Sequence, residues 1–190
     1  MDFSQLEIDG AWIATSSVWT DERGSFNEWF KGADVLASTG IDFKAAQANI
    51  SISDRGVIRG IHYSLAPEGQ AKWVTCVSGS LVDVIVDIRP RSKTYGKYIS
   101  VNLAGRDGRA VLIGPQLGHG FVSLEAGTAI SYLLSSPYSP GNEYEINPFD
   151  PEINIDWKLK QLEGTKVLLS KKDETAPLLA ERARNGELPI

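Results

Sequence analysis

Alternating apolar and polar positions run through the middle of the chain and predict a succession of short β-strands. Residues 81–88 show the pattern best, because β-branched side chains dominate and only Asp83 and Asp87 interrupt the apolar run. Pro90 follows and helps to end this strand, since proline cannot donate a ladder hydrogen bond. Similar patterns predict further strands at Trp73–Val77, Lys97–Leu103, Ala110–Ile113, Gly120–Leu124 and Ala129–Leu134.

Helical periodicity is confined to the two ends of the chain. Gly32–Ser38 and Thr175–Ala183 each predict a short helix. Many short strands at regular spacing are typical of a β-sandwich or jelly roll. We therefore expect an all-β fold, an antiparallel jelly roll with short N- and C-terminal helical additions. The 18 glycines and 9 prolines are spread along the chain, which predicts a single domain over residues 1–190 with its jelly-roll core at roughly 45–157.

Charge and composition narrow the classes of function. The 19 Lys and Arg against 24 Asp and Glu give a net charge of −5, which argues against a nucleic-acid partner. The N-terminus has no basic start followed by an apolar core, and no stretch approaches the length of a membrane helix. A single cysteine, Cys76, cannot form an internal disulfide. We expect a cytoplasmic protein with no membrane contact.

Histidine is scarce, so any imidazole chemistry must use His62 or His119. A metal-binding jelly roll commonly needs two histidines one residue apart, and Ser64 occupies the position where the second one would stand. A three-histidine site is impossible with two histidines, and one cysteine leaves no Cys-rich zinc site. We expect no metal.

Several polar residues next to the predicted strands are candidates for chemistry, although none is specific alone. A histidine at a strand end, such as His62, is more often a hydrogen-bonded core residue. Lys72 opens a strand and is either a solvated edge residue or, if it points inward, a fixed charge for a developing oxyanion. The other candidates have equally ordinary explanations: packing for Tyr132, a helix N-cap for Asp173, and a charged turn for Arg23 and Glu28.

Taken as a set, the motifs are far more specific. The chain contains DERGSFNEWF, QANISIS, GVIRGIHYS, GQAKWVTCVSGSLVDVIVDIRPRSKTYGKY, GHGF, SYLLSSPYSPGNEYEI and LLSKKDETAPLL in this order. From about Trp19 to Leu179 it resembles the dTDP-4-dehydrorhamnose 3,5-epimerase family. The resemblance implies a cupin-like jelly roll, a homodimer without a cofactor, and a dTDP-4-keto-6-deoxyhexose substrate.

The resemblance also implies a role for each matching residue. His62 would remove a proton next to the ketone, and Asp173 would orient His62. Lys72 would stabilise the enolate, while Tyr132 would deliver a proton from the other face. The residues that would bind the substrate are Arg23, Phe26, Glu28, Gln47, Asn49, Arg59, His119, Tyr138, Glu143 and Lys172.

Elementary chemistry agrees with these roles. A ketone at C4 acidifies the hydrogens at both C3 and C5, because either carbanion delocalises onto the same oxygen. Imidazole, with a reference pKa near 6.5, is a suitable base at neutral pH. Arg23 and Arg59 offer planar, permanently charged partners for a diphosphate.

Some positions depart from the family pattern. Leu133 follows Tyr132 where many members have lysine, and Pro137-Tyr138 replaces an aromatic pair, so that Tyr138 alone would stack on the base. The motifs RGIHY and YLLSS resemble those of the family branch that acts in the biosynthesis of antibiotic deoxysugars. Two alternatives therefore stay open: a mono-epimerase acting at C3 only or C5 only, and a catalytically silent sugar-nucleotide-binding module. A 3,4-ketoisomerase shares the fold, but the RGIHY and QAK motifs speak against it.

Overall fold

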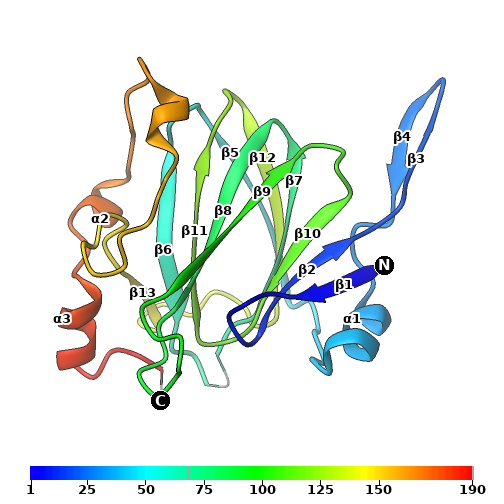
Figure 1. Ribbon diagram of the computed structural model, residues 1–190. Helices are drawn as coiled ribbons and strands as arrows, with labels where there is room; N and C mark the ends of the chain where they lie inside the picture. Colours follow the sequence, from blue (N-terminus) through cyan, green and yellow to red (C-terminus); the bar gives the residue numbers. More distant parts are fainter. Residues whose placement is uncertain (68, 190) are drawn as a thin grey trace.

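Two antiparallel β-sheets pack face to face in the computed structural model, which describes residues 1–67 and 69–189 (Figure 1). The six-stranded sheet has the order β1 (Asp2–Gln5), β2 (Ala11–Thr15), β10 (Arg109–Ile113), β7 (Lys72–Ser78), β12 (Thr128–Leu134), β5 (Gln47–Ser53). The five-stranded sheet has the order β13 (Glu143–Glu145), β6 (Ile58–Ser64), β11 (Leu117–Ser123), β8 (Ser80–Asp87), β9 (Tyr98–Ala104). The predicted all-β jelly roll is confirmed.

Strand β8 shows why the apolar run at its centre is nearly continuous. Leu81 and Ile85 face the core between the two sheets. The alternate residues Val82, Val84 and Val86 pack on the other face against a separate cluster that includes Trp157. Because both faces are buried, the strand keeps apolar residues at almost every position.

A β-bulge in strand β6 brings two polar side chains to the same face. In the pairing with β11, His119 lies opposite His62 and Phe121 lies opposite Arg59, so three steps along β6 match two along β11. The extra residue reverses the usual alternation, and Arg59 and His62 both face the space between the sheets. Gly60 makes this possible, since its φ is +122° and an added Cβ would lie 2.5 Å from the Gly120 Cα.

The helices lie outside the sandwich. Helix α1 (Gly32–Thr39) is confirmed almost to the residue, and it helps to cover the outer face of the six-stranded sheet. The single helix predicted at Thr175–Ala183 is wrong: the structure has α2 (Lys171–Glu174) and α3 (Leu179–Arg184), preceded by the 3-10 turn η1 (Leu159–Leu162). Pro177 explains the break, because the residue before a proline is disfavoured in helical conformation.

A two-stranded hairpin of β3 (Val18–Asp21) and β4 (Gly24–Asn27) stands away from the sandwich (Figure 1). Its aromatic residues Trp19 and Phe26 contact each other, with ring centroids 5.8 Å apart, and both are more than half exposed. None of the described helices is long and apolar enough to cross a membrane.

Candidate active site

A cavity of about 580 Å³ lies between the two sheets, where strands β5, β6, β7, β11 and β12 contribute polar side chains to otherwise apolar walls. Helix α2 closes one side of it. Eleven of the sequence-predicted site residues line this cavity: His62, Lys72, Tyr132, Asp173, Gln47, Asn49, Arg59, His119, Tyr138, Glu143 and Lys172.

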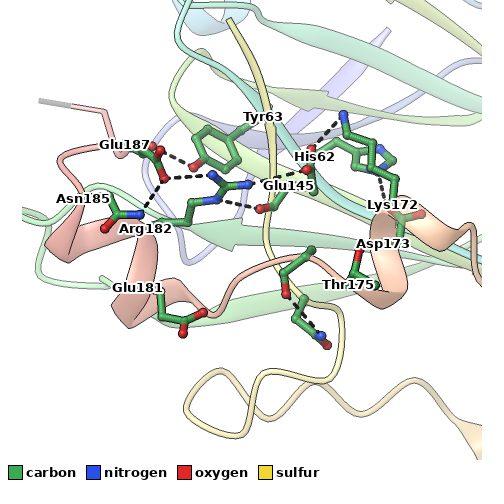
Figure 2. A network of polar contacts seen from close by, with 12 residues as sticks. His62, Tyr63, Glu145, Lys172, Asp173, Thr175, Glu181, Arg182, Asn185 and Glu187 are labelled. Carbon is green, nitrogen blue, oxygen red and sulfur yellow. Dashed lines mark hydrogen bonds and ion pairs between the residues drawn. The ribbon is translucent and has the colours of Figure 1, made fainter. Parts of the chain in front are cut away.

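His62 and Asp173 form a hydrogen-bonded pair, although 111 residues separate them in sequence (Figure 2). The His62 Nε2 donates to Asp173 Oδ1 at 2.6 Å, because a carboxylate only accepts. The Asp173 side chain is 3% exposed and that of His62 is 45% exposed. The buried carboxylate therefore fixes the ring, and the Nδ1 of His62 remains available as a proton acceptor.

The ionised state of Asp173 is maintained by its surroundings. Burial acts to raise the pKa of Asp173, but the interactions with His62, Ser170 and the Gly60 backbone outweigh it and lower the pKa. Ser170 caps helix α2 by accepting a hydrogen bond from the Asp173 backbone N–H at 3.1 Å. Asp173 is thus in the first turn of the helix, rather than the N-cap that its sequence position had suggested as an alternative.

Lys72 is a buried ammonium on the cavity floor. Its side chain donates to the backbone carbonyl of His62 at 3.2 Å, and the residue is 8% exposed. Desolvation lowers the pKa of Lys72 to about 8, against the opposing effect of the negative charges of Glu143 and Asp83. At neutral pH most molecules therefore carry a positive charge on this buried side chain, which lines the cavity.

Asp83 is a polar residue of this region to which the sequence reasoning gave no role. It is fully buried, and its Oδ2 accepts a hydrogen bond from His119 Nε2 at 2.7 Å. Its Oδ1 has no hydrogen-bond partner within residues 1–67 and 69–189. The signal was present in the sequence, because a charged residue within an apolar strand must have a partner when the strand is buried.

Tyr132 lies on the opposite wall from His62. It belongs to β12 of the six-stranded sheet, where it pairs with Asn49 and Val74, whereas His62 belongs to β6 of the five-stranded sheet. The partly exposed Tyr132 side chain lines the cavity. The cavity therefore has a potential proton acceptor on one wall and a phenol on the other.

Two separate sets of hydrogen bonds hold polar groups that line the cavity. Gln47 donates to Asn49 Oδ1 at 3.0 Å and accepts from the Tyr138 backbone N–H at 2.8 Å. The Arg59 Nε donates to Ser53 Oγ at 3.1 Å. These contacts orient two amides and a guanidinium toward one opening, beside the exposed ring of Tyr138.

Three predicted binding residues lie elsewhere. Arg23 and Phe26 belong to the projecting hairpin, where Arg23 pairs with Asp21. Glu28 follows the hairpin and forms an ion pair with Lys31 at 3.2 Å. The cavity of a single chain is therefore lined without them. Within the described part of the chain, no group of three or more His, Cys, Asp or Glu side chains is placed to hold a metal ion.

Comparison with known proteins gives a consistent result. The sequence profile described as dTDP-4-dehydrorhamnose 3,5-epimerase matches residues 5–181. The dTDP-4-dehydrorhamnose 3,5-epimerase of Mycolicibacterium smegmatis is 42% identical over 189 residues, which span 100% of this chain and 91% of that protein. An epimerase structure from Mycobacterium tuberculosis superimposes with a TM-score of 0.95 at 39% identity, covering 100% of this chain and 94% of that one.

A second solved structure has a bound nucleotide sugar. It is a 3'-monoepimerase from Streptomyces bikiniensis in complex with dTDP-quinovose, 41% identical, with a TM-score of 0.91 over 97% of this chain and 91% of that one.

Proposed function

The chain belongs to the dTDP-4-dehydrorhamnose 3,5-epimerase family, and from that premise we propose that it inverts C3 and C5 of a dTDP-4-keto-6-deoxyhexose through an enolate. It is an isomerase that acts on carbohydrates. The observation that carries the mechanism is the placement of His62 and Tyr132 on opposite sheets. A sugar ring bound between them would lose a proton on one face and gain one on the other, which is what inversion requires.

In this mechanism His62 is the base. Asp173 holds its Nε2 at 2.6 Å, so the Nδ1 is the nitrogen that would accept the proton from C3 or C5. The carboxylate would also stabilise the imidazolium that forms, because it is buried and ionised. The partly exposed His62 would exchange its proton with solvent while the enolate is bound, and Tyr132 would regain from solvent the proton that it delivers.

Lys72 would stabilise the enolate. A sugar C–H is a far weaker acid than imidazolium, so the energy of the enolate must be lowered for the proton transfer to proceed. A preorganised ammonium that is itself buried would interact strongly with an oxyanion at C4. The same charge would favour either enolate, toward C3 or toward C5, since both place the negative charge on one oxygen.

The rim of the cavity would bind the dTDP group. Arg59 and Lys172 supply positive charge for the diphosphate, and the exposed ring of Tyr138 offers a stacking surface for the base. His119, Glu143, Gln47 and Asn49 would contact the sugar or the nucleotide from the remaining sides.

The active form would be a homodimer. Trp19 and Phe26 on the hairpin, and Ile50 and Ile52 on the edge strand β5, leave large apolar side chains in solvent when the chain is alone. In a dimer that covers these surfaces, the hairpin would reach the cavity of the partner subunit. This arrangement would bring Arg23, Phe26 and Glu28 to a substrate site, which the single chain does not do.

We assign the enzyme to the cytoplasm. Cys76 is the only cysteine, and it is buried. Burial raises the pKa of the Cys76 thiol to about 11, so the group stays protonated and unreactive. A fold that needs no disulfide suits a reducing compartment.

Solvent exchange tests this function. The protein is incubated with dTDP-4-keto-6-deoxyglucose in deuterated water, and deuterium at C3 and C5 is located by NMR. We expect deuterium at both carbons together with inverted product, and no exchange with the His62→Ala variant. Exchange at one carbon only would contradict the proposal and identify the protein as a mono-epimerase. Tight dTDP binding without any exchange would replace it with a binding module.

A further inference from the structure

Glu145, at the end of strand β13, is the centre of a polar network that joins the last helix to the cavity (Figure 2). It lies directly opposite His62 in the pairing of β13 with β6, and its side chain is 15% exposed. One carboxylate oxygen, Oε2, lies 2.8 Å from the Lys172 ammonium, and the other, Oε1, lies 3.5 Å from the Arg182 guanidinium.

The contact with Lys172 matters because of how Glu145 is buried. The Oε2 atom is shielded from solvent, and within the described residues its close polar contact is the Lys172 ammonium at 2.8 Å. The ammonium of Lys172 therefore compensates the charge at Oε2, as the guanidinium of Arg182 does at Oε1. Lys172 itself is 58% exposed and lines the cavity, so its outer side is open to an anion.

Arg182 is held firmly on helix α3. Its Nε donates to the Glu145 backbone carbonyl at 2.9 Å, and its Nη1 pairs with Glu187 at 2.8 Å. The guanidinium also lies over the ring of Tyr144, 5.1 Å from its centroid. With its side chain only 10% exposed, this permanently charged group has little freedom to leave Glu145.

The C-terminal segment is hydrogen-bonded to strand β6, which contains His62. The Tyr63 hydroxyl donates to the Glu187 carbonyl at 2.7 Å, and Tyr63 stacks on Tyr144 with centroids 5.6 Å apart. Burial raises the pKa of Tyr63, so the hydroxyl remains a donor. Tyr63 is the neighbour of His62 on β6, and the network therefore has a fixed position relative to the cavity.

We propose that Arg182 and Glu145 are positioning residues for the substrate: Arg182 fixes the Glu145 carboxylate, and Glu145 holds the Lys172 ammonium at the cavity mouth, ready for the diphosphate. The inference rests on the proposed function, since it assigns the anion to a nucleotide diphosphate. Four flexible carbons separate the Lys172 charge from its backbone. A side chain that is ordered before binding loses less entropy when the anion arrives.

Two single variants distinguish positioning from a simple effect of charge. Glu145→Gln removes a negative charge near the site, and Arg182→Met removes a positive one. Acting through space alone, the first change would strengthen dTDP binding and the second would weaken it. Positioning predicts that both weaken it, by about 3- to 10-fold, the range expected for the ordering of one long side chain.

The measurement is dTDP affinity by isothermal titration calorimetry, accompanied by steady-state kinetics with the keto-sugar. We expect the two variants to raise KM with kcat changed less than about twofold. Arg184→Met is the matched control, because it removes the same charge from an exposed position of the same helix. Its dTDP affinity should equal that of the wild type.

A double-mutant cycle connects the effect to Lys172. Lys172→Met weakens dTDP binding, and adding Glu145→Gln to it should cause no further loss, since there is no ammonium left to hold. Tighter binding by Glu145→Gln, or losses that multiply in the double variant, would overturn the inference. If Arg182→Met does not fold, the cycle of Lys172→Met and Glu145→Gln still tests whether Glu145 acts through Lys172.

The outcomes also separate this inference from the proposed function. Normal turnover of the keto-sugar with a multiplicative cycle rejects the positioning role alone. A coupled cycle on dTDP affinity without any turnover rejects the epimerase activity alone. Failure of the wild type to bind dTDP rejects both.

Discussion

Lys72 carries a positive charge where charge is costly, and this makes the site sensitive to alkaline pH. The pKa of Lys72 is lowered to about 8 by burial. We predict that kcat/KM falls as pH rises through about 8, because the ammonium proposed to stabilise the enolate loses its proton. The measurement is a pH profile of kcat/KM between pH 6 and 10.

Stability should change in the opposite direction. A lysine whose pKa is lower in the folded than in the unfolded state destabilises the fold while it is charged. Between pH 8 and about 10.5 the unfolded chain retains a proton that the folded protein has lost, so this contribution to stability rises by about 3 kcal/mol. Chemical denaturation at pH 7 and 9 therefore separates a loss of activity by titration from a loss by unfolding.

A variant of Asp83 tests whether Lys72 is the group that sets the alkaline limb of the pH profile of kcat/KM. Its charge acts to raise the pKa of Lys72, so Asp83→Asn should move the alkaline limb to lower pH. Asp87→Asn is the control, since Asp87 is also fully buried on β8 but is bonded to Arg89, Ser92 and Thr94. An unmoved limb in Asp83→Asn would show that Lys72 is not the group that titrates.

At the scale of single residues, local motifs indicate the catalytic candidates that the structure places at the cavity, but not the side chains that these candidates contact. His62 and Lys72 lie within recognisable local motifs. The pairing of His62 with Asp173 came from family resemblance, because no local pattern connects residues 111 positions apart. Asp83 and Glu145 received no role, since their importance depends on which side chains the two sheets bring next to them.

At the scale of elements, the bulge in β6 determines which residues reach the cavity. We predict that Gly60→Ala destabilises the protein by more than about 2 kcal/mol, because a Cβ would lie 2.5 Å from Gly120 and the positive φ adds strain. Gly127→Ala is the matched comparison: its φ is +72°, but an added Cβ meets nothing within 4 Å. It should cost about 1 kcal/mol.

Chemical denaturation of the two variants checks this prediction. Equal losses of stability would mean that the close approach of β6 and β11 is unimportant and that only the backbone angle matters. Any surviving Gly60→Ala protein should also have reduced activity, because a shift of β6 changes how Arg59 and His62 face the cavity.

Strands were easier to predict than helices in this chain. The central strands have alternating or continuous β-branched residues, and the structure places all of them within three residues of the predicted bounds. The prediction of one C-terminal helix was wrong because it followed the helical periodicity of Thr175–Ala183. It ignored Pro177, which disfavours helical conformation in the residue before it. The burial of Arg182 in helix α3 was also unpredictable, since it depends on the C-terminal segment folding back onto Tyr63 and Tyr144.

At the scale of the whole molecule, the proposed dimer has a direct genetic test. If the hairpin of one subunit serves the cavity of the other, co-expressed His62→Asn and Arg23→Ala chains form mixed dimers with one intact site. We therefore predict that the mixture recovers activity up to about half that of the wild type per mixed dimer, although each variant alone is impaired or inactive. Activity no higher than the average of the two separate variants would place Arg23 outside the partner's site.

The central claim is that a proton leaves on the His62 side and returns on the Tyr132 side. The most direct measurement is the reaction of Tyr132→Phe in deuterated water, with deuterium counted separately in recovered substrate and in inverted product. Inversion should slow by about 100-fold or more, while His62 continues to exchange substrate protons on its own face. The ratio of exchanged substrate to inverted product should therefore rise steeply. An unchanged ratio, with exchange and inversion slowed equally, would contradict the account.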